Sequence, residues 1–205
     1  MKTTSWLLKT IRVVLTIAWY ANIILIVVAF SMLTIKFITS DSVEFSNPVK
    51  YPLNPEIVKL ESLTPNAHNI TIQGDQGILK MKLKNTFSYI ASAYFFLIAL
   101  EVLIMTIIYQ LRKFFDSIKD SAPFKYDNIK RVRIIALCFT LLTPLHILLG
   151  VSNAMILSGQ VENFSLKNMV WEESFIGLIL GAVIYIMADV FKYGFELQKE
   201  NGEFV

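Results

Sequence analysis

Charged residues are scarce in this 205-residue chain, and their scarcity argues against most classes of soluble protein. Asp, Glu, Lys and Arg make up 17% of the sequence, whereas an average soluble domain has about a quarter. Hydrophobic residues reach 55%, and the mean hydropathy is +0.56. A single globular core cannot absorb so many apolar residues, so we do not expect an ordinary soluble enzyme.

The sequence also contains a single cysteine and none of the common catalytic motifs. Cys138 has no partner in the chain, so the sequence contains no disulfide framework and no Cys-x-x-Cys redox site. It lacks His-Glu-x-x-His, Gly-x-Ser-x-Gly and a glycine-rich phosphate loop. One His and one Glu in the apolar runs are too few ligands for a metal, and His68 lies outside those runs. We therefore expect no enzymatic activity, no metal and no cofactor.

The chain instead contains four apolar runs of membrane-spanning length, at residues 13–35, 87–109, 134–157 and 175–191. A transmembrane helix needs about 17 to 25 such residues. The first run is interpreted as an anchor, because a signal peptide has a shorter apolar region, of about 7 to 15 residues, and a small-x-small cleavage site. The sequence predicts a mainly α-helical integral membrane protein with four transmembrane helices in a single membrane domain.

The distribution of basic residues predicts the orientation. Twelve lysines and arginines lie in the amino-terminal segment, the 110–133 connection and the carboxyl-terminal tail, against seven in the two remaining connections. Basic residues near span ends remain on the cytoplasmic side. We therefore expect both termini and the 110–133 connection to be cytoplasmic.

Residues 36–85 form the predicted extracytoplasmic segment, which contains a β-hairpin. Apolar and polar residues alternate over 69–73 and 78–83, separated by a Gly-Asp-Gln-Gly turn. The second strand has Lys80, Lys82 and Lys84 on one face and Leu79, Met81 and Leu83 on the other. A lone hairpin is marginally stable, so a third strand near 43–45 or the helix ends must cover the apolar face. The lysine row could bind an anionic ligand or a lipid headgroup, or it could form a solvated face that prevents edge pairing.

The 110–133 connection is strongly basic and begins with an amphipathic pattern. Apolar residues recur at helical spacing, at Leu111, Phe114, Phe115 and Ile118. This pattern predicts a helix that continues the second span or lies on the lipid headgroups. Pro123 ends that helix, and Asp127 is a suitable cap for the next one.

Seven basic and three acidic residues give this connection a net charge of +4. Such a cluster attracts the anionic lipids of the inner leaflet or docks a cytoplasmic protein. The candidate residues are Arg112, Lys113, Lys130, Arg131 and Arg133. Direct nucleic-acid binding is not expected, because no recognised motif is present and the membrane would compete for the same charges.

Four polar side chains lie at comparable depths in the predicted spans, about 12 to 18 Å from their cytoplasmic ends at the helical rise per residue. They are Asn22, Glu101, His146 and Tyr185. We hypothesise a buried cluster in which Glu101 hydrogen-bonds His146, beside a helix distortion at Pro144. The cluster is either a proton-responsive or ligand-responsive site or a set of hydrogen bonds that specify helix packing.

Two features of the fourth span predict contacts with neighbouring helices. Asp189, near the cytoplasmic end, is expected to pair with Arg12, Arg112 or Lys192. Gly177 and Gly181 form a Gly-x-x-x-Gly face that permits close helix approach, expected to serve internal packing.

Two stretches of the chain carry a family resemblance. The first comprises Phe114-Phe115-Asp116-Ser117-Ile118, Pro123-Phe124, Asn128-Ile129 and Arg131-Val132-Arg133; the second comprises Ala188-Asp189-Val190-Phe191, Gly194 and Leu197-Gln198-Lys199-Glu200-Asn201. They resemble the bacterial membrane family called domain-of-unknown-function family 2975, and the outer segment is the weakest part of the resemblance. The resemblance implies a four-span protein of the bacterial inner membrane, with a small helix-turn-helix regulator as partner. Family members commonly end in an acidic, Thr-bearing segment, where this chain has Gly202-Glu203-Phe204.

Three function classes can be compared. An intramembrane enzyme lacks the necessary motifs, and a transporter is weakened by the absence of internal repeats or paired broken helices. We therefore favour a non-enzymatic regulatory or interaction protein with a cytoplasmic partner. The alternative is a small transporter or proton-responsive conduit that uses the buried polar cluster.

Overall fold

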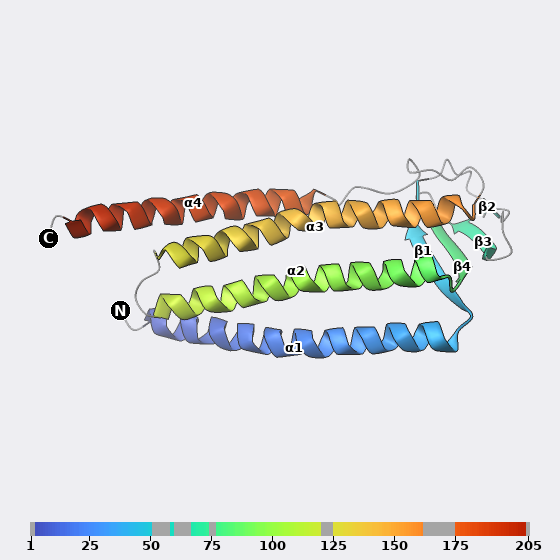
Figure 1. The fold of residues 1–205 in the computed structure, drawn as a ribbon, viewed down its shortest axis with the longest axis horizontal. Helices are drawn as coiled ribbons and strands as arrows, with labels where there is room; N and C mark the ends of the chain where they lie inside the picture. The colour runs from blue at the N-terminus through green and yellow to red at the C-terminus, as the bar shows by residue number, and fades with distance from the viewer. Residues whose placement is uncertain are drawn as a thin grey trace. The chain divides into compact units, whose positions relative to one another are not determined.

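The computed structural model describes residues 3–50, 58–59, 67–73, 77–119, 125–161 and 175–203. These residues form four α-helices and one four-stranded antiparallel sheet (Figure 1). The helices are α1 Thr3–Thr39, α2 Phe87–Lys119, α3 Tyr126–Ser158 and α4 Ile176–Glu203, and the strands are β1 Ser42–Pro48, β2 Val58–Lys59, β3 Ala67–Gln73 and β4 Ile78–Lys84. The predicted mainly α-helical fold, with a small β segment between the first two helices, is confirmed.

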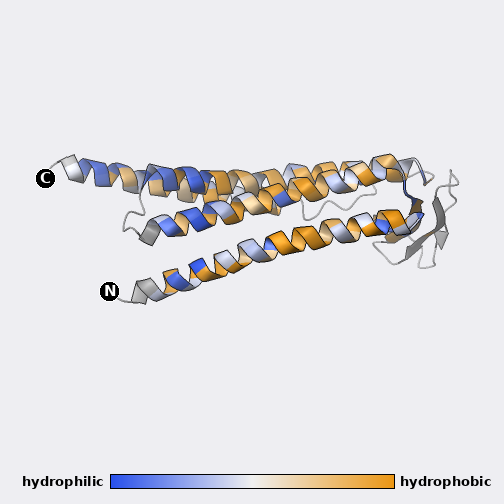
Figure 2. Ribbon diagram, turned by 60° about the horizontal axis from the view of Figure 1, so that its bottom comes forward, coloured by the Kyte–Doolittle hydropathy of each residue, from blue (hydrophilic) through white to orange (hydrophobic). Residues whose placement is uncertain are grey.

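All four helices are long and apolar enough to cross a membrane. Hydrophobic residues line most of their length, and hydrophilic residues gather at the carboxyl-terminal end of α4 (Figure 2). Many large apolar side chains of α1 point outward; Ile24 is 63% exposed and Leu25 65% exposed. Water would penalise so much apolar surface, whereas lipid hydrocarbon does not. The chain is therefore a multi-pass membrane protein.

The chain divides into two compact units. The first unit comprises Met1–Val28, Ala99–Pro144 and Phe175–Val205, and the second comprises Ala29–Ile98 and Leu145–Ser174. The first unit contains α4 and parts of α1, α2 and α3, and the second contains the sheet and the remaining parts of those three helices.

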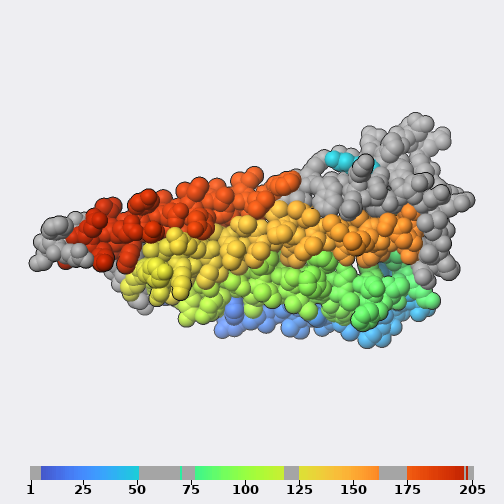
Figure 3. Space-filling view, turned by 45° about the horizontal axis from the view of Figure 1, so that its top comes forward, coloured from blue at the N-terminus to red at the C-terminus, as the bar shows by residue number. Residues whose placement is uncertain are grey.

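In the first unit, α4 packs closely on α3, and Figure 3 shows the two helices side by side. A Cβ at Gly177 would lie 2.7 Å from the carbonyl oxygen of Phe139, and one at Gly181 would lie 2.9 Å from that of Ala136. Only a residue without a side chain permits this approach, as the Gly-x-x-x-Gly spacing predicts. The buried hydroxyl of Thr143 accepts a hydrogen bond from the backbone N–H of Leu178, at 3.1 Å. This bond satisfies a donor of the first turn of α4, which has no partner inside its own helix.

In the second unit, the strands follow the order β1-β4-β3-β2, and β1 pairs with β4 from Ser42 opposite Lys84 to Pro48 opposite Ile78. The predicted hairpin is β3–β4, and the predicted third strand is β1. The β3–β4 register shifts between His68 and Thr71. Gly77, at φ 40°, lies directly before β4 in a backbone conformation that favours glycine.

The sheet has one apolar face and one lysine face, as the alternation predicts. Leu79, Met81 and Leu83 are buried, whereas Lys80, Lys82 and Lys84 are exposed. The apolar face packs against Ala154 and Leu157 at the end of α3 and against Val161, which follows that helix. The end of α3 thus covers the apolar face, because four short strands alone leave that face open to water.

Some sequence predictions need correction or lie outside the described residues. Helix α3 begins at Tyr126, so Asp127 lies inside the first turn and is not its cap; a carboxylate there still favours the helix dipole. Pro123 and the first three residues of the predicted hairpin turn, 74–76, lie outside the described residues.

Candidate functional site

The basic end of α2 is a continuation of the second span. Helix α2 runs without interruption to Lys119, which decides between the two arrangements that the amphipathic pattern allows. Phe114 packs edge-on against Phe115 in the same helix and against Phe191 of α4, with ring centroids 5.4 and 5.6 Å apart. Phe114 of the apolar stripe therefore contacts α4, and Lys113 and Asp116 remain exposed.

A hydrogen-bond network joins the end of α2 to the start of α3. Asn128 is fully buried and donates to the hydroxyl of Ser117, at 2.9 Å. The guanidinium of Arg131 donates to the carbonyl oxygen of Lys113, at 3.0 Å, and to the side-chain oxygen of Asn128, at 2.8 Å. Because a buried amide is costly to leave unpaired, these bonds fix the two helix ends against each other.

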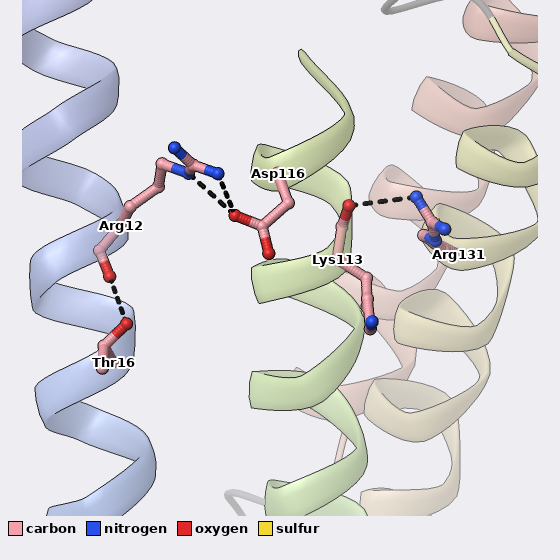
Figure 4. A network of polar contacts seen from close by, with 5 residues as sticks. All are labelled: Arg12, Thr16, Lys113, Asp116 and Arg131. Atoms are coloured by element: carbon pink, nitrogen blue, oxygen red, sulfur yellow. Dashed lines mark hydrogen bonds and ion pairs between the residues drawn. The ribbon is translucent and has the colours of Figure 1, made fainter. Parts of the chain in front are cut away.

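A second polar contact joins α1 to the same end of α2. The Nε of Arg12 donates to a carboxylate oxygen of Asp116, at 2.8 Å, and a terminal guanidinium nitrogen contacts the same oxygen (Figure 4). Arg112 lies over the Trp19 ring, 5.5 Å from its centroid. Figure 4 also shows Arg131 reaching the carbonyl of Lys113 from the next helix. Asp116 thus forms an ion pair with Arg12. Polar contacts therefore join α1, α2 and α3 at this end of the first unit.

Asp189 pairs with Arg133, at 3.0 Å, so the prediction of Arg12, Arg112 or Lys192 as its partner is wrong. The physical reason is that α4 packs along α3, which carries Arg133, whereas Arg12 forms an ion pair with Asp116. Lys192 instead pairs with Glu196, one turn along its own helix. Arg133 also lies 5.5 Å from the ring centroid of Tyr185.

The five basic candidates therefore divide into two groups. The three arginines have partners: Arg112 lies over the Trp19 ring, and Arg133 pairs with Asp189. Arg131 belongs to the α2–α3 network. Lys113 and Lys130 are exposed. A hollow of about 380 Å³ lies beside Lys130, with Lys130 and Arg133 among its lining residues and Ile134, Leu137 and Tyr185 as apolar walls. Among the described candidates, exposed positive charge is thus presented by Lys130 and by Lys113, whose ammonium also lies 5.8 Å from the Tyr109 ring centroid.

The predicted intramembrane cluster is present in part. Asn22 donates to a carboxylate oxygen of Glu101, at 2.5 Å, and both residues are partly buried. Tyr185 contacts Arg133, and no described contact joins it to Asn22 or Glu101. His146 is exposed and belongs to the second unit. The hydrogen bond between Glu101 and His146 therefore stays a prediction.

Metal ligation finds no support among the described residues, where no three His, Cys, Asp or Glu side chains form a group able to hold an ion. Cys138 is buried and free within α3. The exposed ammonium groups at the basic end can form ion pairs and charge-assisted hydrogen bonds with anionic groups.

Sequence reasoning missed Ser117 and Asn128 as a pair, although both lie in the motifs that carry the family resemblance. The sequence did contain a signal for the part of the network on α3. Asn128 and Arg131 are three residues apart, which places both side chains on one helix face.

Residues 46–205 match the family described as Protein of unknown function (DUF2975). No curated protein and no solved structure matches the chain. The match covers more than half of the chain and includes all of α2, α3 and α4.

Proposed function

Because the chain belongs to the DUF2975 family, whose description names no activity, we propose a function from the geometry: a non-enzymatic regulatory membrane protein that docks a cytoplasmic partner on its basic helix ends. The observation that carries this proposal is the network of Arg131, Asn128 and Ser117. It holds the ends of α2 and α3 in one arrangement and leaves Lys113 and Lys130 exposed.

A preformed surface of this kind suits a protein partner. Side chains that are already ordered lose little entropy on binding, and exposed lysines attract acidic surfaces and speed encounter. The basic residues of this connection and of the two chain ends outnumber those of the remaining connections. This excess supports placing the basic helix ends on the cytoplasmic side of the inner membrane. The partner we propose is an acidic face of a small helix-turn-helix regulator, and direct nucleic-acid binding is not part of the proposal.

Contact with anionic inner-leaflet lipids is part of the same proposal. Lys130 and Arg133 lie just before the apolar run that starts at Ile134, which is where headgroups meet hydrocarbon. Basic residues at this depth contribute about 1 kcal/mol each to binding of an anionic membrane. Lipid contact would orient the surface and still leave Lys113 available to a partner.

Co-purification tests the proposal directly. The full chain is isolated from native membranes in mild detergent, as the parent and as the Lys113→Gln/Lys130→Gln double variant. We expect the double variant to lose the partner, since it removes two exposed charges and leaves the α2–α3 network intact. Lys192→Gln is the matched control, because Lys192 is an exposed lysine of α4 that pairs with Glu196. Partner retention by the double variant, or equal loss in the control, would contradict the proposal.

A second candidate function, a proton-responsive conduit, is favoured by the Asn22–Glu101 hydrogen bond within the spans. Ionisable residues at such positions are costly and commonly functional. Proton flux into liposomes containing the protein, with Glu101→Gln as the comparison, tests this candidate. Flux that the substitution abolishes would favour a conduit over a docking protein.

A further inference from the structure

Two hollows of the second unit adjoin at the carboxyl-terminal end of α1. The larger, of about 810 Å³, lies against α1 and α2 and is lined mainly by apolar side chains, among them Met32, Leu33 and Leu97. The smaller, of about 280 Å³, is lined by polar residues alone: Lys36, Ser40, Ser42, Glu44 and Lys82. Lys36 and Ser40 line both hollows. An apolar groove thus adjoins a polar, net positive depression.

Small residues and aromatic contacts together create the groove. Ala29 of α1 and Ala93 of α2 contribute little volume to its walls. Next to these alanines, Phe30 and Tyr94 bring their ring centroids to 5.5 Å, and the Tyr94 hydroxyl hydrogen-bonds Thr34, at 2.6 Å. These contacts fix the spacing of the two helices in this unit. The groove is therefore a feature of the packing and does not depend on a loop conformation.

The polar depression is held in place by Asn85, which lies just after β4. Its side-chain amide donates to the carbonyl oxygens of Phe37, at 3.2 Å, and Ser40, at 2.5 Å. These are carbonyls of the last turn of α1 and the residue after it, which have no donor inside the helix. Asn85 thereby fixes the end of α1, and with it Lys36, against the sheet.

Glu44 is the one acidic residue among the described residues that line the depression with the two lysines. Lys36 and Lys82 are exposed, and among the described residues neither side chain makes a hydrogen bond or an ion pair. Glu44 lies opposite Lys82 in the β1–β4 register, and no ion pair joins them. Two ammonium groups and one carboxylate leave a net positive charge at this point. An anionic group placed between the lysines would accept charge-assisted hydrogen bonds from both.

We propose that these adjoining hollows bind an anionic phospholipid from the leaflet on the side of the sheet. Its acyl chain lies in the groove between α1 and α2, and its phosphate lies between Lys36 and Lys82. The groove volume is within the range of about 300 to 1,000 Å³ that is typical of small-molecule sites. Lys36 follows directly on the apolar run that ends at Ile35, so the lysine is at headgroup depth while the groove is at hydrocarbon depth.

A phospholipid fits both halves of the site, whereas a helix from a second copy fits one half. An apolar helix in the groove would leave the lysines beside it without an anionic partner, which is costly when water is displaced. Lipid chains surround every span, so contacts in the groove distinguish lipids weakly. The headgroup contacts must supply the selectivity.

The test is lipid binding to the full chain in neutral detergent, followed by native mass spectrometry. Phosphatidylglycerol is titrated against phosphatidylcholine for the parent, Lys36→Gln, Lys82→Gln and the double variant. Each single substitution is expected to weaken phosphatidylglycerol binding about fivefold and the double about 25-fold, since each basic residue near a headgroup contributes about that factor. Phosphatidylcholine binding should change much less.

Lys80→Gln is the matched control, because Lys80 lies on the same exposed face of β4 and does not line the depression. Ala93→Phe fills the groove and should weaken binding of both lipids, while a melting curve for each variant verifies folding. Equal losses for Lys80→Gln and Lys82→Gln would overturn the proposal, because the effect would then be general surface charge. Absence of a preference for phosphatidylglycerol, or a dimer that Ala93→Phe disrupts without changing lipid binding, would also overturn it. The site uses residues of the second unit alone, so its failure leaves the proposed docking function unaffected.

Discussion

Arg131 and Asn128 lie one turn apart on α3, and a single guanidinium nitrogen of Arg131 donates both to the Asn128 side chain and to the backbone carbonyl of Lys113 on α2. Arginine is suited to this role because its planar group directs several donors at fixed angles, which lysine cannot reproduce. Arg131 is therefore a residue that positions the basic end, while the exposed lysines beside it are available to a partner.

Asn128→Ala is expected to destabilise the protein. The substitution leaves the Ser117 hydroxyl and one Arg131 donor without their buried partner, which costs on the order of 2 kcal/mol. Thermal unfolding in detergent measures the change. Lys125→Ala, at an exposed position just before α3, is the control and should leave the melting temperature unchanged. Equal melting temperatures for the two variants would mean that the network does not stabilise the helix ends.

Glu101→Gln is expected to preserve folding, because the glutamine oxygen can still accept the hydrogen bond from Asn22. Glu101→Leu should lower the melting temperature, because it leaves the Asn22 amide unpaired inside the spans. Adding Asn22→Leu to Glu101→Leu should restore much of the loss, since removing both polar partners avoids an unpaired group. Failure of the second substitution to rescue the first would show that Glu101 has another essential contact.

Gly181→Ala is expected to disrupt the packing of α4 on α3. The added Cβ would lie 2.9 Å from both the Ala136 carbonyl oxygen and the Thr140 backbone nitrogen, and backbone atoms cannot easily move away. Overpacking of this kind costs about 1 to 3 kcal/mol. Gly202→Ala is the matched control, because no described atom lies within 4 Å of its Cβ position. A stable Gly181→Ala variant would argue that the two helices can separate without loss.

The predicted orientation can be measured by cysteine labelling in intact cells. In a Cys138→Ala background, Lys84→Cys should react with an impermeant reagent added outside, whereas Lys130→Cys should react only after the membrane is opened. Both lysines are exposed, so burial does not limit either reaction. External labelling of Lys130→Cys would reverse the assignment of sides and remove the basis for a cytoplasmic partner.

Local sequence patterns determined the four spans, the amphipathic stripe that follows the second span and the two faces of β4. Each of these depends on residues close together in the chain, where hydropathy and a period of about 2 or 3.6 residues decide the structure. The Gly-x-x-x-Gly spacing also predicted close packing, since small residues permit approach whichever helix is the neighbour.

Only the tertiary structure decided which polar groups meet. Asp189 pairs with Arg133 and Arg12 pairs with Asp116, although the sequence allowed several partners for Asp189. Likewise, Lys36 and Lys82 line one depression although they are far apart in the chain. A sequence period shows which face of a helix or strand a side chain occupies, but the neighbour of that face depends on how distant segments pack. The ion pairs and the proposed lipid site therefore required the folded chain.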